Sequence, residues 1–112
     1  MRLHLLAALL LLPALISPAA AQTARTSCNI RFNNRGIVAG DVDCTATFRA
    51  GRLERVKFLF SNGKWYDWST FASQVTPDPR WPECVRYTQQ DGNQWQACTV
   101  PSPSQLFQGA QR

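Results

Sequence analysis

The chain of 112 residues contains a single histidine, His4, and it lies in a segment that we expect to be removed. Residues 1–21 have the three parts of a secretory signal peptide: a positive charge at Arg2, an apolar run over residues 3–16, and small residues before the cleavage point. Cleavage there leaves a domain without histidine. Such a domain cannot use a Ser-His or Cys-His nucleophile, and it lacks the commonest general base.

Other chemical signatures are absent as well. The sequence has no Cys-x-x-Cys motif, no glycine-rich phosphate loop and no cluster of residues with metal-ligand spacing. Behind the signal peptide no stretch is long and apolar enough to span a membrane, which takes about 20 residues. We therefore expect a soluble, non-catalytic protein without cofactor or metal, located in the periplasm or secreted.

Acidic residues are scarce: seven Asp and Glu stand against twelve Lys and Arg, for a formal net charge of +5. A mild positive excess favours contact with anionic surfaces, such as lipid head groups, acidic glycans or a negatively charged protein. So small an excess is more typical of a solvated surface that keeps a small domain in solution. Export argues against nucleic acid as the partner.

Four cysteines follow the signal peptide, where export would bring them into an oxidising compartment. The last two lie on a predicted hairpin with a three-residue loop, 90–92, that ends in glycine. Counting outward from this loop places Cys84 opposite Cys98 at a non-hydrogen-bonded site, where side chains approach most closely. The hairpin therefore predicts a cross-strand disulfide.

The other two cysteines, Cys28 and Cys44, then pair by elimination. Their register does not match the tightest turn between them, so we expect a longer loop or a bulge at Gly40. Each bridge closes about 15 residues, which stabilises the domain by roughly 3 kcal/mol in the chain-entropy model. We interpret all four cysteines as structural.

The rest of the chain alternates apolar and polar residues with a period of two, which is typical of strands with one buried face. We predict a single all-β domain over residues 28–100: an antiparallel meander of about six strands, curled into a disulfide-stapled sandwich or partial barrel with at most one short helical turn. Residues 22–27 should form a flexible N-terminal arm and residues 101–112 a flexible C-terminal tail. The predicted strands cover residues 28–32, 37–48, 53–60, 65–68, 84–89 and 93–100.

Asn62-Gly63, between two apolar runs, is the strongest short signal for a β-hairpin. A two-residue loop there places Phe60 opposite Trp65 and Lys57 opposite Trp68. One face of the hairpin would then join the core, with Val56, Phe58, Phe60 and Trp65. The other face would lie outside, with Arg55, Lys57, Leu59, Tyr66 and Trp68.

Two irregular segments follow this hairpin. Residues 69–75 have apolar side chains at helical spacing before a proline, which predicts one short helical turn. Residues 76–82 contain three prolines and should form a stiff loop without regular structure.

The four tryptophans divide into two pairs. Trp65 and Trp95 fit the core by strand parity, whereas Trp68 and Trp81 do not, and they bracket the proline-rich loop. Flat rings beside cations would suit stacking on sugar rings or anchoring a protein partner. The alternative is that Trp81 folds back over Trp68 as a small satellite of the core. The candidate ligand-binding residues are Arg55, Lys57, Tyr66, Trp68 and Trp81.

We therefore expect a non-catalytic binding module of the cell envelope or secretome, which recognises an anionic glycan or an envelope protein through this aromatic and basic surface. One alternative is a protein-directed inhibitor or accessory subunit that inserts the proline-rich loop, 76–82, into its target. The least favoured alternative is a small glycan hydrolase that uses Asp67, predicted opposite Phe58 on the apolar face, together with Asp78 or Glu83.

Overall fold

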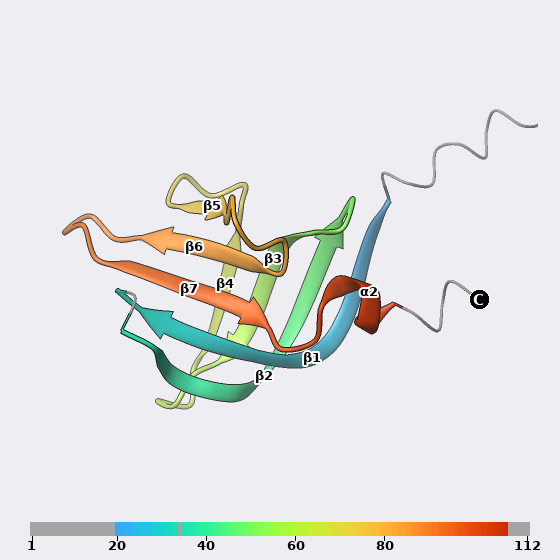
Figure 1. Cartoon of the computed structure of the whole chain (residues 1–112). Coiled ribbons are helices and arrows are strands. Elements are labelled where there is room, and N and C mark those ends of the chain that lie inside the picture. The colour runs from blue at the N-terminus through green and yellow to red at the C-terminus, as the bar shows by residue number, and fades with distance from the viewer. Residues whose placement is uncertain (1–19, 34, 108–112) are drawn as a thin grey trace, which may run out of the picture.

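The computed structural model describes residues 20–33 and 35–107, so nearly all of the predicted signal peptide lies outside the described residues. In this part of the chain, seven antiparallel strands form one sheet in the order β4-β3-β2-β1-β7-β6-β5 (Figure 1). The same part contains one helical turn, and the all-β prediction is confirmed. The elements are β1 (Ala21–Phe32), β2 (Ile37–Arg49), β3 (Arg52–Leu59), β4 (Trp65–Ser69), β5 (Val75–Pro77), β6 (Cys84–Thr88), β7 (Gln94–Thr99) and α2 (Pro103–Leu106).

The sheet consists of two series of hairpins. Strands β1 to β4 follow one another as a meander, β5 to β7 form a second series, and antiparallel pairing of β1 with β7 joins the two. The edge strands β4 and β5 contact each other, so the sheet curls into a nearly closed barrel (Figure 1). A small barrel of this kind fills its interior with side chains.

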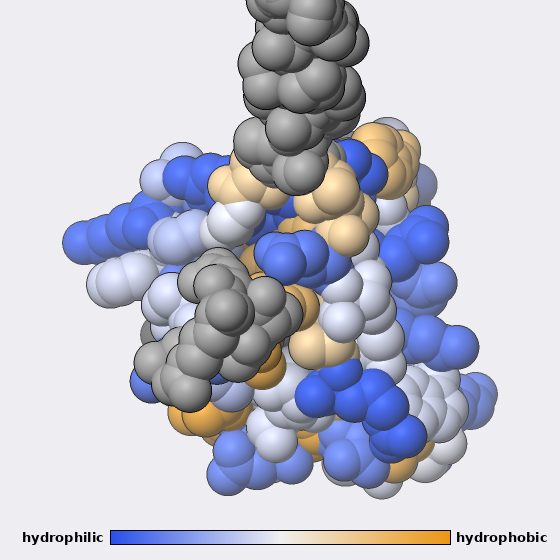
Figure 2. All heavy atoms as spheres, turned by 90° about the vertical axis from the view of Figure 1, so that its right-hand side faces the viewer, coloured by the Kyte–Doolittle hydropathy of each residue, from blue (hydrophilic) through white to orange (hydrophobic). Residues whose placement is uncertain are grey.

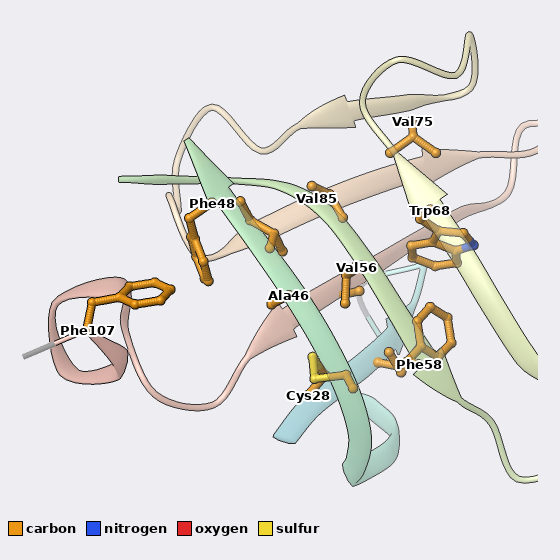
Figure 3. Packing of buried hydrophobic residues seen from close by; sticks show 13 residues of the cluster. Cys28, Ala46, Phe48, Val56, Phe58, Trp68, Val75, Val85 and Phe107 are labelled. Atoms are coloured by element: carbon orange, nitrogen blue, oxygen red, sulfur yellow. A yellow bond between two sulfur atoms is a disulfide. The ribbon is translucent and has the colours of Figure 1, made fainter. Parts of the chain in front are cut away.

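Buried apolar side chains run through the barrel from one end to the other (Figure 3). Phe48 and Phe107 lie at one end, with ring centroids 5.7 Å apart in an edge-to-face arrangement. Phe58 and Trp68 lie at the other end, 4.9 Å apart and again edge to face. Ala46 lies between the two pairs (Figure 3). The ring of Phe107 therefore covers the end of the barrel next to α2.

Residues 22–27 and 101–107, which belong to the two segments predicted to be flexible, take part in the fold. Residues 22–27 belong to β1 and pair with β2, because the backbone N–H and C=O groups of the long strand β2 need partners along its whole length. After β7, Ser102 and Gln105 form a capping box that starts α2 and leads the chain back onto the barrel at Phe107. Residues 108–112 of the predicted tail lie outside the described residues.

The β1–β2 pair contains the irregularity that was expected at Gly40. Its register slips between Cys28 and Ile30, so that Gly40 and Asp41 stand opposite the single residue Asn29. Asp41 has a positive φ of 51°, and its N–H donates a hydrogen bond of 3.0 Å to the side-chain oxygen of Asn29. A bulge of this kind increases the local bend and twist, which helps the sheet to close.

Both predicted disulfides are present. Cys84 and Cys98 face each other across β6 and β7 with their Cα atoms 4.1 Å apart, the close approach of a non-hydrogen-bonded pair. The three-residue loop of this hairpin is confirmed too, with Gly92 at a φ of 92°. Cys28 and Cys44 join β1 to β2 inside the core. The described residues include no free cysteine, and two disulfides indicate an oxidising compartment.

The β3–β4 hairpin differs from the prediction by one residue of register. Phe60 N donates to Lys64 O, and Gly63 N donates to Phe60 O, both at 2.9 Å, so the loop has three residues instead of two. A two-residue type I′ loop would need positive φ at both Asn62 and Gly63, and of these only Gly63 has it, at 82°. The side-chain oxygen of Asn62 instead accepts a hydrogen bond from Lys64 N at 3.0 Å, which stabilises the longer loop.

This slip moves every side chain of β4 to the opposite face of the sheet. Trp68 pairs with Val56 and is buried in the core, whereas Trp65 pairs with Leu59 and is 48% exposed. Both predictions are therefore wrong: Trp65 was expected in the core and lies outside, and Trp68 was expected outside and lies in the core.

Residues 70–74 form turns and not the predicted helical turn. Ala72 N donates to Ser69 O at 2.8 Å, and Thr88 N donates to Gln74 O at 2.9 Å, which ties the segment to β6. The apolar spacing that suggested a helix comes from the ends of two strands and a turn between them. The helical turn of the described residues is α2 instead.

The face on the right of Figure 1 is mostly hydrophilic, with a few hydrophobic patches among the charged and polar residues (Figure 2). Over residues 20–33 and 35–107, no helix has the length and apolar character that crossing a membrane requires.

Candidate functional site

A pocket of about 490 Å³ is lined in part by Phe58 and Trp68. These two side chains lie at the end of the barrel away from α2 (Figure 3). The volume of the pocket falls within the usual range for small-molecule sites, roughly 300–1,000 Å³. Its walls come from all seven strands except β2 and from the segment between β4 and β5. Six aromatic side chains line it: Phe58, Phe60, Tyr66, Trp68, Tyr87 and Trp95.

The aromatic rings of the pocket hold one another in place. Phe58 is central: Tyr66 stacks on it with centroids 5.7 Å apart, and Trp68 meets it edge to face at 4.9 Å. Tyr87 lies 5.2 Å from Trp68 and connects the β4 side of the wall to β6. Aromatic pairs at such distances contribute about 0.5–1.5 kcal/mol beyond the area they bury. The wall is therefore largely formed before any ligand arrives.

Strand pairing explains why these rings converge. Residues directly opposite each other in antiparallel strands share a face. Tyr87 and Trp95 are such partners across β6 and β7, and Phe58 and Tyr66 are partners across β3 and β4. Phe60, just beyond β3, closes the ring of contacts with its centroid 6.0 Å from that of Trp95.

The polar groups of the pocket are few and mostly uncharged. Gln74 is exposed and Gln89 is half-buried, and neither side-chain amide has a hydrogen-bond partner among the described residues. Asp67 is the one charged residue in the described lining, and its carboxylate lies 3.6 Å from Arg55. The pocket thus combines apolar walls with two amides that can donate and accept hydrogen bonds.

The five predicted binding residues do not form one surface. Arg55 and Lys57 are exposed on β3 and line no part of the pocket. Tyr66 and Trp68 line the pocket, with Trp68 buried in the core. Trp81 lies apart from both groups, 49% exposed in the loop before β6. The register slip of β4 separates the set, because it turns Tyr66 and Trp68 away from the two cations.

An aromatic and basic pair does remain on the outer face, with a different tryptophan. Lys57 Nζ lies 5.9 Å from the ring centroid of Trp65. Next to it, Arg55 pairs with Asp67, and both side chains of this ion pair are 54% exposed. Exposed contacts of this kind contribute little to stability, about 0–1 kcal/mol each.

One buried carboxylate holds the proline-rich loop. Asp78 is 0% exposed. Its Oδ1 accepts hydrogen bonds from Arg80 N at 2.8 Å and Trp81 N at 3.2 Å, and its Oδ2 accepts from Gln96 Nε2 at 2.7 Å and Arg86 Nε at 3.1 Å. Burial alone would raise the pKa of Asp78, but these four hydrogen bonds hold the pKa below its ordinary value of 3.8. The carboxylate is thus ionised and fully engaged in structure.

Asp67 and Asp78, two of the three carboxylates of the hydrolase hypothesis, are not in the environment that it assumed for them. Asp67 stands opposite Lys57 and not Phe58, and although it borders the pocket, its side chain is more than half exposed. It therefore lacks the burial that would make it a general acid. Asp78 has no free hydrogen-bonding capacity to offer a substrate. In the described part of the chain, no group of three or more His, Cys, Asp or Glu side chains could hold a metal ion.

Sequence reasoning missed most of the pocket lining. The 90–92 loop does carry a usable signal, because the outward count that pairs Cys84 with Cys98 also places Tyr87 opposite Trp95, so that both rings share one face. Phe60 was expected in the core without a partner from β7. Gln74 and Gln89 lie in a turn and at a hairpin end, where glutamine carries no sequence signal.

No family model, curated protein or solved structure matches this chain. Its function must therefore be inferred from the pocket and the surfaces themselves.

Proposed function

We propose that this domain is an exported, non-catalytic binding module whose pocket holds one neutral sugar ring of an envelope or extracellular glycan. The observation that carries the proposal is the hollow of about 490 Å³ between six aromatic side chains, with the two glutamine amides in its lining. The two disulfides support export to the periplasm or the medium.

The chemistry of a sugar ring fits these walls. A pyranose has an apolar C–H face that packs on aromatic rings, and hydroxyl groups that each need a hydrogen-bond partner once water is removed. Gln74 and Gln89 offer a donor and an acceptor each. No lysine or arginine is found in the described lining and Asp67 adds a negative charge to it, so the ring in the pocket should carry no acidic group even if the glycan carries such groups elsewhere.

Isothermal titration with neutral hexose and N-acetylhexosamine oligosaccharides tests the proposal. Tyr66→Ala removes a half-exposed ring from the pocket wall and should weaken binding about tenfold, the equivalent of about 1.4 kcal/mol. Trp65→Ala is the matched control, because Trp65 immediately precedes Tyr66 in β4 and its side chain lies on the opposite, outer face of the sheet. Its affinity should equal that of the wild type.

A second matched pair tests the amides. Gln89→Ala removes a hydrogen-bonding group from the lining and should weaken binding about three- to tenfold. Gln90→Ala changes the exposed neighbour in the turn and should leave binding unchanged. The proposal fails if folded Tyr66→Ala and Gln89→Ala proteins bind like the wild type, or if the wild type binds no member of the panel.

A specific observation favours a second candidate function, that of a protein-directed inhibitor or accessory subunit. Asp78 fixes the backbone N–H groups of Arg80 and Trp81, so the loop presents a half-exposed tryptophan in an ordered conformation. Ordered aromatic anchors are common hot spots of protein interfaces. This function predicts that a protein from the native envelope co-purifies at equal stoichiometry with the wild type and is lost with Trp81→Ala.

A further inference from the structure

Three polar residues form a row across β1, β7 and β6 on the outer face of the barrel. Arg31 of β1 pairs with Gln96 of β7, and Gln96 pairs with Arg86 of β6. Directly opposed residues share a face, so the two guanidinium groups flank the Gln96 amide, with their backbones two strand spacings, about 10 Å, apart. All three side chains line one small hollow of about 20 Å³.

Two members of this row, Arg86 and Gln96, are held in place by hydrogen bonds to a buried carboxylate. The carboxylate of Asp78, 0% exposed, accepts a hydrogen bond of 3.1 Å from Arg86 Nε and one of 2.7 Å from Gln96 Nε2. The side chain of Arg86 is nevertheless 39% exposed, so part of its guanidinium group faces solvent. An arginine fixed in this way loses little further conformational freedom when it binds a ligand.

The third member carries a charge without a partner. Among the described residues, the Arg31 side chain has neither a hydrogen bond nor an ion pair. Arg52 adds positive charge nearby, because its Nη1 donates a hydrogen bond of 3.0 Å to the backbone oxygen of Asp78. The Asp78 carboxylate pairs with Arg86, and within residues 20–33 and 35–107 the charges of Arg31 and Arg52 are not neutralised by an ion pair.

We propose that Arg31 and Arg86 together bind one oxyanionic group, a carboxylate, sulfate or phosphate. Guanidinium groups match the oxygens of such anions with paired, charge-assisted hydrogen bonds. The amide nitrogen of Gln96 is engaged by Asp78, which leaves the amide oxygen to accept a hydrogen bond from a hydroxyl beside the anion. The site goes beyond the sugar pocket, since none of these three residues lines that pocket.

Nuclear magnetic resonance of the arginine Nε–H groups tests this site. Sodium sulfate, phosphate and acetate are titrated separately, with sodium chloride keeping the ionic strength constant so that general screening does not change. The signals of Arg31 and Arg86 should shift and saturate. Stronger binding of sulfate and phosphate assigns the site to tetrahedral anions, and stronger binding of acetate assigns it to carboxylates, so either result supports an oxyanion site.

Variants separate a specific site from general attraction. Arg31→Gln should weaken binding of the preferred anion about tenfold or more, and Arg31→Lys should restore only part of it because lysine lacks the paired donors. Arg31→Gln should fold normally, since its side chain has no partner to lose. Arg25→Gln is the control, because Arg25 is a second arginine on β1, exposed where Arg31 is half-buried, and this variant should bind like the wild type.

The proposal is overturned if the shifts grow linearly without saturation, if Arg25 shifts as much as Arg31, or if Arg31→Gln binds like the wild type. Tyr66→Ala should leave anion binding unchanged. A failure of the sugar pocket and a failure of the anion site are therefore distinguished by the same set of proteins.

Discussion

Replacement of Asp78 by asparagine tests whether one buried carboxylate holds the proline-rich loop to the sheet. The asparagine side chain fills the same space, and its oxygen can still accept hydrogen bonds from Arg80 N and Trp81 N. Its NH₂ group then faces Arg86 Nε and Gln96 Nε2, which are both donors. Two hydrogen bonds to a charged acceptor are lost, and donors are brought against donors.

The magnitude follows from these contacts. Hydrogen bonds to a charged group contribute about 1.5–3 kcal/mol each. Arg86 is 39% exposed and Gln96 is half-buried, so water can replace part of the hydrogen bonding that each side chain loses. The lower end of that range therefore applies to each hydrogen bond. We expect the free energy of unfolding to fall by about 2–4 kcal/mol, a large fraction of the roughly 5–15 kcal/mol typical of a small domain.

Urea denaturation followed by tryptophan fluorescence, with the disulfides intact, measures this difference. Asp67→Asn is the control, because its ion pair with Arg55 is exposed on both sides and spans 3.6 Å. That change should cost less than about 1 kcal/mol. If Asp78→Asn costs no more than Asp67→Asn, the loop does not depend on the buried carboxylate and the reasoning is refuted.

Three further predictions concern stability. The pKa of Asp78 in the folded state lies below 3.8, so the ionised carboxylate stabilises the fold fully above that pH, and this stabilisation is lost as the pH falls through the lower pKa. Circular dichroism should therefore show that the wild type loses stability below about pH 3.8 more steeply than Asp78→Asn. Equal slopes for the two proteins would contradict this. In urea denaturation, Phe107→Ala should lower the free energy of unfolding by about 2–4 kcal/mol. The control Ser104→Ala, at an exposed position of the same turn, should lower it by less than about 0.5 kcal/mol. Similar values for both variants would mean that Phe107 does not cover the barrel end. Trp68→Ala should cost about 3–5 kcal/mol and Trp81→Ala less than about 1 kcal/mol, and the reverse order would place Trp68 on the surface.

The parts of the fold that depend on local pattern could be predicted from the sequence. Period-two alternation identified six of the seven strands in the described residues, and counting outward from the 90–92 loop gave the pairing of Cys84 with Cys98. The prediction was wrong for β5 (Val75–Pro77), which falls where a helical turn and a loop without regular structure were expected. Pairing of β1 with β7 could not be predicted, because nothing near Cys28 in the sequence specifies its partner Thr99. The role of Phe107 was missed for the same reason, since its contact with the core is made across the whole domain.

The candidate site depended on one residue of register, and that residue was ambiguous. Asn-Gly suits a two-residue type I′ loop and also a three-residue loop with glycine in the positive-φ position. The sequence around Asn62 does not decide between them, yet the choice sends Trp68 either outward or into the core. Tyr66 was predicted as a binding residue because it was expected to lie beside Lys57 on the outer face. It lines the pocket instead, because the register of β4 is shifted by one residue.

The four tryptophan indole signals in a ¹⁵N–¹H spectrum test the pocket most directly, because they report from both inside and outside it. Trp68 and Trp95 line the pocket, whereas Trp65 and Trp81 are about half exposed elsewhere. Titration with a neutral oligosaccharide should shift the signals of Trp68 and Trp95 until they saturate and leave the other two in place. Shifts confined to Trp65 or Trp81, with Trp68 and Trp95 unmoved, would contradict a sugar ring in the pocket.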